Sequence, residues 1–186
     1  MDIKGKTEVL NIANLITVLR ILGTLVLIFV KPLSVLFFVI YAFTGLTDAA
    51  DGFIARKTGT QGEFGAKLDS VADLVFYTVI MIKILPFLIK EMPKVIWYFV
   101  AAVLAVRLVS YLVAAFKYHR FSSMHTYLNK FTGAAVFIIP FMLITSFKTF
   151  YAFFAVCLGI AASLEELIIH FKSESYNASV KSLLLM

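Results

Sequence analysis

Long apolar stretches alternate with short polar segments along most of the chain. A helix needs roughly 20 mostly apolar residues to cross the hydrocarbon core of a bilayer, and several stretches approach or exceed that length. We expect helices over residues 12–30, 33–48, 64–88, 95–116, 127–146 and 150–171. The pattern therefore predicts an all-α integral membrane protein with six transmembrane helices.

The N-terminus is expected to lie on the membrane surface. Asp2 to Leu10 mixes charged residues with Ile3, Val9 and Leu10, which predicts a short interfacial amphipathic helix. The run from Ile12 to Val30 lacks a small-residue cleavage site, so it is interpreted as the first span and not as a signal peptide. One membrane domain over residues 1–186 follows, with an interfacial helix at 1–11, a six-helix core at 12–171 and a flexible tail at 172–186.

Composition supports solvation by lipid. Sixty-one per cent of the residues are hydrophobic, only 15% are charged and the mean hydropathy is +0.95, whereas soluble domains have about a quarter charged residues. The net charge of +6 comes from Lys and Arg between apolar stretches, so we expect anionic-lipid contacts and no nucleic-acid binding. Cys157, the single cysteine, is interpreted as a small buried apolar residue.

The distribution of basic residues predicts the topology. Cytoplasmic loops of membrane proteins carry an excess of Lys and Arg. If the N-terminus is cytoplasmic, that side holds Arg56, Lys57, Lys117, Arg120, Lys172 and Lys181, whereas the other side holds Lys31, Lys90, Lys94 and Lys148. We therefore expect both termini in the cytoplasm.

Four aspartates stand close together within the apolar sequence. Asp48 and Asp51 are three residues apart and Asp69 and Asp73 four apart, so on helices each pair projects from one face. A tight turn through residues 58–62 can fold the second helix back on the first, and we expect it to bring the two pairs together. The sequence therefore predicts a cluster of four carboxylates.

Such a cluster requires a cation. Like charges a few ångströms apart oppose one another's ionisation, and ionisable groups inside a span are costly unless they are paired. Oxygen ligands without His or Cys favour Mg²⁺ or Mn²⁺, or Ca²⁺, over zinc or copper. Four carboxylates suffice for two ions, the arrangement that assists phosphoryl transfer. The alternative is that the aspartates only pair with Arg56, Lys57 and Lys67 at a membrane boundary.

The same residues carry a resemblance to a known family. The pattern D-x2-D-G-x2-A-R-x8-G-x3-D-x3-D is complete in Asp48, Asp51, Gly52, Ala55, Arg56, Gly65, Asp69 and Asp73. It resembles the signature of the CDP-alcohol phosphotransferases. Upstream, Asn14, Thr17 and Arg20 are similar to the N-x-x-T-x-x-R pattern of the family's first helix, although Ala13 replaces its usual proline.

The resemblance implies a reaction and roles for these residues. Members transfer a phosphatidyl group from a CDP-linked lipid, here expected to be CDP-diacylglycerol, to a small alcohol and release CMP. By motif position, Asp48, Asp51 and Asp69 are implied to bind metal, and Asp73 both to bind metal and to act as general base. Nucleotide and phosphate contacts are assigned to Asn14, Thr17, Arg20, Gly52, Ala55, Arg56 and Gly65.

From chemistry alone, some of these roles stay open. Gly52 permits close approach either of the nucleotide or of a neighbouring helix, and Gly65 either opens space or serves a helix start. Arg56 offers a bidentate fork to phosphate but also suits a cytoplasmic anchor.

A second, basic group of residues is the candidate site for the acceptor. Arg107 lies deep inside an apolar stretch, so we expect it to face a polar cavity. Lys117, His125 and Lys130 join it as candidate acceptor contacts, whereas positive-inside anchoring explains Lys117 equally well and His170 is interpreted as an interface residue. A basic pocket and small size favour glycerol 3-phosphate as acceptor, in the manner of phosphatidylglycerophosphate synthases.

Two other functions use aspartates in membranes. Intramembrane prenyltransferases hold Mg²⁺ on a diphosphate with aspartate pairs but lack the G-x2-A-R-x8-G connection, and cation transporters line their ion paths with buried acids. Release of CMP separates these classes, because a prenyltransferase releases pyrophosphate and a transporter releases neither.

We also expect a homodimer, since the small residues Ala101, Ala102 and Ala105 permit close helix approach.

Overall fold

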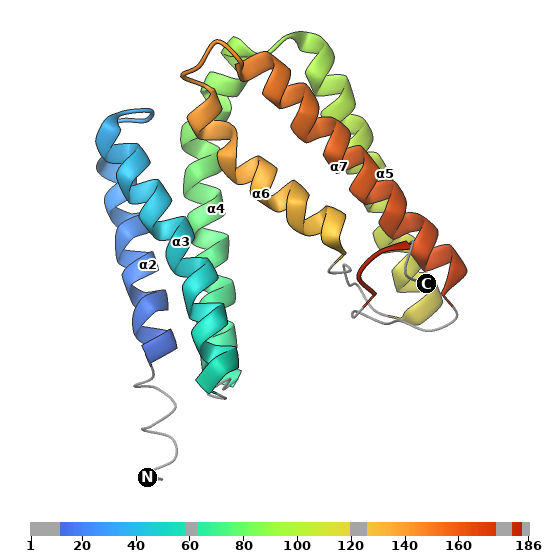
Figure 1. The fold of residues 1–186 in the computed structure, drawn as a ribbon, viewed down its shortest axis with the longest axis horizontal. Helices are drawn as coiled ribbons and strands as arrows, with labels where there is room; N and C mark the ends of the chain where they lie inside the picture. The colour runs from blue at the N-terminus through green and yellow to red at the C-terminus, as the bar shows by residue number, and fades with distance from the viewer. Residues whose placement is uncertain (1–11, 59–62, 120–125, 174–179, 184–186) are drawn as a thin grey trace. The chain divides into compact units, whose positions relative to one another are not determined.

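The computed structural model describes residues 12–58, 63–119, 126–173 and 180–183, with side chains described except at 12–14, 48–58, 63, 64 and 66. Its long elements are all helices, shown in Figure 1: α2 (Ile12–Phe29), α3 (Val35–Thr58), α4 (Glu63–Glu91), α5 (Lys94–Tyr118), α6 (Tyr127–Met142) and α7 (Lys148–Lys172). The six predicted helices and the all-α class are thus confirmed for the described residues. The predicted interfacial helix at 1–11 lies outside them.

Three helices in the described part of the chain are long and apolar enough to cross a bilayer. They cover Lys67–Glu91, Lys94–Tyr118 and Lys148–Lys172. The remaining apolar helical segments are shorter, at Leu15–Phe29, Val35–Thr47 and Tyr127–Met142. Membrane embedding is therefore supported by three helices, and the crossing of the bilayer by all six stays a prediction.

The chain divides into two compact units, residues 1–89 and 90–186. The prediction of a single domain stays a prediction, and each unit is described by itself.

In the first unit α3 packs along α2 in the opposite direction, and α4 reverses direction again (Figure 1). Stacked rings join α3 to α4, because Tyr41 lies 5.8 Å from Phe37 and 5.7 Å from Phe76 between ring centroids. Lys83 of α4 donates to the Val30 carbonyl at 2.8 Å, just beyond the end of α2.

Gly23 allows α2 to approach α3 closely. A Cβ atom at this position would lie 2.8 Å from Oγ1 of Thr44, a fully buried residue whose hydroxyl donates to the Ile40 carbonyl at 2.7 Å. We expect Gly23→Ala to lower the free energy of unfolding by about 1–3 kcal/mol, as overpacking does, despite the better helix propensity of Ala. Unfolding of the purified protein in one detergent measures the change.

Gly133 of α6 provides the matched control, because a Cβ atom there would meet nothing within 4 Å. Gly133→Ala is expected to leave stability unchanged or to raise it by up to about 1 kcal/mol through helix propensity. Equal stabilities for the two variants would contradict the close contact at Gly23.

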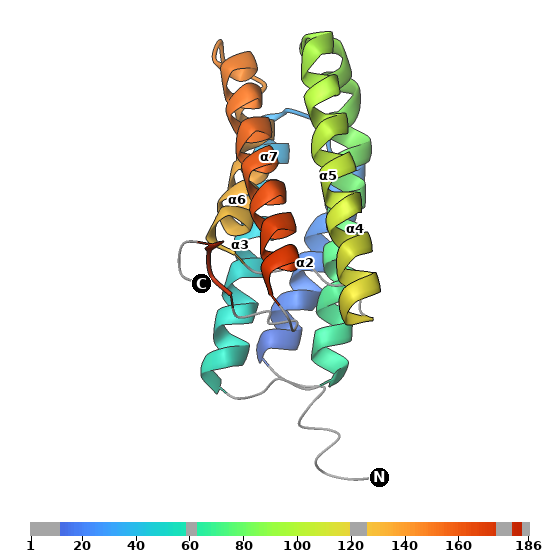
Figure 2. The same cartoon turned by 90° about the vertical axis from the view of Figure 1, so that its right-hand side faces the viewer.

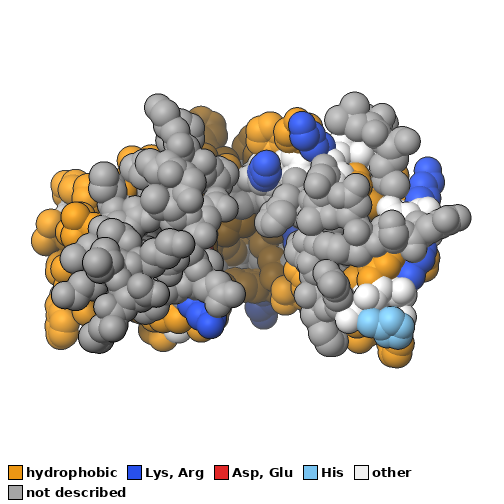
Figure 3. Space-filling view, turned by 90° about the horizontal axis from the view of Figure 1, so that it is seen from below, with side chains coloured by type: hydrophobic (Ala, Val, Ile, Leu, Met, Phe, Trp, Pro, Cys, Tyr) orange, Lys and Arg blue, Asp and Glu red, His pale blue; other side chains and the backbone are white. Residues whose placement is uncertain are grey.

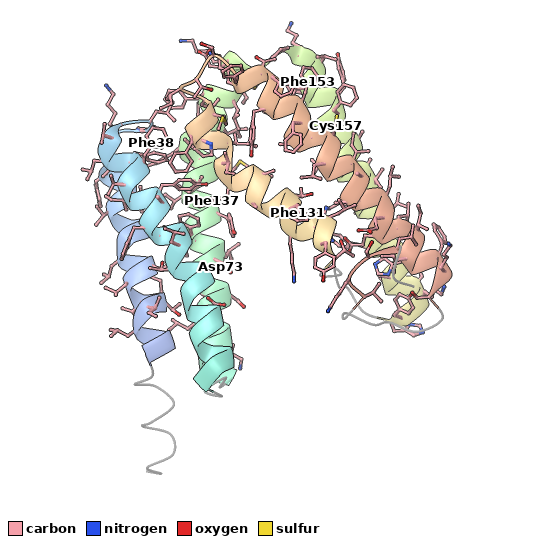
Figure 4. The ribbon with its side chains drawn as sticks, viewed as in Figure 1. Phe38, Asp73, Phe131, Phe137, Phe153 and Cys157 are labelled. Carbon is pink, nitrogen blue, oxygen red and sulfur yellow. The ribbon has the colours of Figure 1, made fainter. Side chains whose placement is uncertain are left out.

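The second unit is built around α7. Both α5 and α6 pack against it, and α5 and α7 run in the same direction in Figures 1 and 2. Small residues on the buried face of α7 let the neighbouring backbones come close: Ala152, Ala155, Gly159, Ala162 and Ser163. Cys157 projects from α7 (Figure 4) and is exposed, so its interpretation as a buried residue is wrong.

Part of the segment predicted as a flexible tail is hydrogen-bonded. The Lys181 carbonyl accepts from the backbone N–H of Tyr127 at 2.9 Å. Oε1 of Glu165 accepts from the Ser182 hydroxyl at 2.9 Å and from the Leu183 N–H at 3.0 Å. Residues 180–183 therefore return to the start of α6 and to the buried side of α7, an arrangement that apolar patterning does not indicate.

Candidate functional site

Where α2 meets α4 in the first unit, the structure describes the side chains of three residues of the predicted site: Arg20, Asp69 and Asp73. One nitrogen of Arg20, Nη1, donates to Oδ1 of Asp69 at 2.8 Å and to Oδ1 of Asp73 at 2.6 Å. The Arg20 side chain is fully buried, whereas the carboxylates of Asp69 and Asp73 are 42% and 36% exposed. Arg20 thus holds both carboxylates from the buried side, and Asp73 is labelled on α4 in Figure 4.

Local sequence explains this geometry. Asp69 and Asp73 are one helical turn apart on α4, so their side chains project from one face. On α2, the polar residues Thr17, Arg20 and Thr24 are all buried and recur at spacings of three and four. Because a buried charge is stable only when it is paired, the position of Arg20 depends on the carboxylates of α4.

Other residues of the predicted site lie outside the described side chains. These are Asn14, Asp48, Asp51, Gly52, Ala55 and Arg56, although their backbone is helical in α2 and α3. Helical backbone from Val35 to Thr58 puts Asp48 and Asp51 on one face, as their spacing predicts. Their convergence with Asp69 and Asp73 stays a prediction, and Gly65 lies in the first turn of α4.

The described part of the site fits a divalent cation. The two Oδ1 atoms lie 2.8 Å and 2.6 Å from a single nitrogen, so both carboxylates already face one cationic group. Oxygen-only ligands are those that Mg²⁺ and Mn²⁺ prefer. Among the described residues no group of three or more His, Cys, Asp or Glu gathers as metal ligands, and a fuller ligand set requires Asp48 and Asp51.

In the second unit, Arg107 belongs to a partly buried polar network that the sequence did not predict. Its Nη2 donates to Oδ1 of Asn129 at 2.6 Å, and its Nη1 lies 3.5 Å from Oε2 of Glu166. Nδ2 of Asn129 donates to the same Glu166 oxygen at 2.9 Å. The polar partners of Arg107 are thus side chains of α6 and α7, and the polar cavity expected at Arg107 stays a prediction. Glu166, an acidic residue within an apolar stretch, is the sequence signal that could have indicated one of these partners.

The other candidate acceptor contacts differ in their environment. Nζ of Lys117 donates to the carbonyls of His170 and Phe171, both at 3.0 Å, and thereby caps the C-terminal end of α7. Lys130 is exposed, and His125 lies outside the described residues. Figure 3 shows basic side chains on the face seen from below. His170, interpreted from the sequence as an interface residue, is fully buried beside Glu166.

Comparison with known proteins identifies a family for this helical chain. Residues 10–164 match the CDP-alcohol phosphatidyltransferase family, and the chain belongs to that family. The matched region includes every helix from α2 to α6 from end to end and most of α7. Members of the family generally depend on divalent metal.

Each of three curated relatives matches about two fifths of the chain. A CDP-diacylglycerol–serine O-phosphatidyltransferase from Methanocaldococcus jannaschii is 36% identical over 72 residues, which cover 39% of this chain and 33% of the relative. A CDP-diacylglycerol–glycerol-3-phosphate 3-phosphatidyltransferase from Pseudomonas fluorescens is 38% identical over 78 residues, 39% of this chain and 40% of the relative. The enzyme of the same name from Salmonella choleraesuis is 35% identical over 77 residues, 39% of this chain and 42% of the relative.

The match thus spans between a third and about two fifths of the length of these relatives. No solved structure matches the chain.

Proposed function

We propose that this protein transfers the phosphatidyl group of CDP-diacylglycerol to a small polar alcohol and releases CMP. The observation that carries the proposal is the pair of carboxylates, Asp69 and Asp73, gathered on Arg20 within a complete family motif. Membership of the CDP-alcohol phosphatidyltransferase family supports the same reaction.

The proposed cofactor is Mg²⁺ or Mn²⁺, as two ions held by Asp48, Asp51, Asp69 and Asp73. When bound, the ions neutralise charge on the diphosphate and on the departing CMP. The side chains of Asp69 and Asp73 are partly exposed, which supports access of such ions to their carboxylates.

Asp73 is the proposed general base. Its carboxylate takes the proton of the acceptor hydroxyl while the hydroxyl oxygen forms a bond to the phosphorus that carries diacylglycerol. The bond from that phosphorus to the bridging oxygen breaks, and the electron pair leaves with CMP. Atoms and charge balance without an oxidant or reductant.

The nucleotide and its phosphates are assigned to the residues around the carboxylates. Arg56 supplies a planar fork to a phosphate, and Gly52 and Gly65 let the nucleotide approach the helix backbone. Asn14, Thr17, Arg20 and Ala55 complete the proposed nucleotide side. We place the site at the cytoplasmic face, with both termini cytoplasmic, the diacyl tails reaching it from the lipid and the protein acting as a homodimer.

Glycerol 3-phosphate is the proposed acceptor. The relatives from Pseudomonas fluorescens and Salmonella choleraesuis carry this acceptor in their names, whereas the one from Methanocaldococcus jannaschii carries serine. Arg107, Lys117, His125 and Lys130 are the proposed acceptor contacts, because a phosphate-bearing acceptor requires cationic partners.

An acceptor panel tests this choice. Purified protein in lipid nanodiscs receives CDP-diacylglycerol, Mg²⁺ and either glycerol 3-phosphate, serine, inositol phosphate or no acceptor, and the lipid product is identified by mass. We expect phosphatidylglycerol phosphate in the first reaction and little product in the others. A preference for serine would keep phosphatidyl transfer and overturn the acceptor.

A further inference from the structure

We infer that Arg20 is the internal counter-ion of Asp69 and Asp73, and that a divalent cation competes with this arginine for their negative charge. The inference deepens the proposed function and rests on it, since it concerns cation binding at the proposed metal ligands. It assigns to Arg20 a role in addition to its proposed contact with the nucleotide phosphates.

The geometry favours this role. A single guanidinium nitrogen lies within 2.8 Å of one Oδ1 atom and 2.6 Å of the other, and the two carboxylates come from successive turns of α4. The guanidinium group is fully buried, and the acids are partly exposed. A buried arginine with two carboxylates at hydrogen-bonding distance is positioned to neutralise them and faces away from solvent.

Competition follows from distance and charge. Mg²⁺ binds its oxygen ligands at about 2.0–2.1 Å, closer than Nη1 lies to either Oδ1 atom, so an ion held by these two atoms would have to displace the guanidinium nitrogen. An ion held by the other carboxylate oxygens would still lie near the guanidinium charge, and like charges at that separation repel each other. In either arrangement, removal of the positive charge strengthens cation binding.

Two other roles predict different results. If Arg20 only contacts substrate phosphate, its replacement leaves cation affinity unchanged when no substrate is present. If it only orients the carboxylates, its replacement weakens cation binding, by about 10- to 100-fold for typical supporting residues. The direction of the change therefore distinguishes the three roles.

Mn²⁺ titration of the purified, substrate-free protein is the test, with free Mn²⁺ followed by electron paramagnetic resonance. Arg20→Met is expected to bind Mn²⁺ about tenfold more tightly or better, because the competing charge is gone. Arg20→Lys keeps a point charge and is expected to stay within about threefold of the original affinity. Lys83→Met is the matched control, since Lys83 also reaches across the first unit but donates to a backbone carbonyl.

Folding is followed on the same samples. If Arg20→Met is unstable without metal, saturating Mn²⁺ is expected to restore its thermal stability, because the ion then replaces the counter-ion. Unchanged or weaker Mn²⁺ binding by Arg20→Met, or failure of Mn²⁺ to restore an unfolded variant, would overturn the counter-ion role. Absence of Mn²⁺ binding by the unmodified protein would instead count against the proposed metal site.

Discussion

Replacement of Asp73 by Asn is expected to lower CMP release about 100- to 10,000-fold, the usual range for loss of a general base. The amide preserves side-chain volume but does not accept the acceptor's proton, and three carboxylates remain to hold a cation. Much of the affinity for CDP-diacylglycerol is therefore expected to survive. CMP release and binding of the lipid, each measured across a Mg²⁺ titration, separate the two effects.

Asp51→Asn serves as the comparison, because it removes a proposed ligand without removing the base. This variant is expected to weaken both metal and nucleotide binding. Near-normal turnover by Asp73→Asn would remove the base assignment. Rescue of Asp73→Asn by high Mg²⁺ alone would make Asp73 a ligand only, and a loss greater than 10,000-fold would show that its proposed metal contacts contribute in addition to its role as base.

Replacement of Arg107 by Met is expected to destabilise the second unit by about 3–5 kcal/mol, the range seen when one partner of a buried ion pair is removed. Glu166 is only 1% exposed, so its carboxylate would lose a cationic partner and keep its burial. The Arg107 side chain is 24% exposed, which favours the lower end of that range. Chemical unfolding of the protein in detergent, followed by far-ultraviolet circular dichroism, measures the loss.

The double variant Arg107→Met with Glu166→Leu distinguishes stability from acceptor binding. With both charges removed, much of the lost stability is expected to return. If Arg107 also binds acceptor phosphate, the restored double variant shows a raised KM for glycerol 3-phosphate at unchanged affinity for CDP-diacylglycerol. A double variant as unstable as Arg107→Met would contradict the pairing of Arg107 with Glu166.

Helices were predictable because their signal is local. Long apolar runs require helical hydrogen bonding in lipid, and the predicted starts near residues 12, 64 and 95 lie within a residue of those observed. The end of α3 was harder to place. Its last turns, around Asp48 to Thr58, are polar, so apolar patterning stops before the helix does.

Partners across helices were not predictable in the same way. Spacing placed Thr17 and Arg20 on one face of the first helix, but it contains no information about which distant carboxylates that face meets. Asn129 and Glu166 were missed for the same reason, since their hydrogen bond depends on the packing of α6 against α7. Whether the Cys157 side chain is exposed likewise depends on which face of α7 packs against the neighbouring helices.

Metal-dependent release of CMP from CDP-diacylglycerol by the purified protein tests phosphatidyl transfer most directly. The protein in nanodiscs is given CDP-diacylglycerol, glycerol 3-phosphate and Mg²⁺, and nucleotide and lipid products are quantified with and without a chelator. We predict that CMP and the new phospholipid form in equal amounts. The chelator is expected to abolish formation of both products, and Mg²⁺ or Mn²⁺ is expected to restore it. Release of pyrophosphate in place of CMP, or no nucleotide product with any acceptor of the panel, would contradict the proposed function.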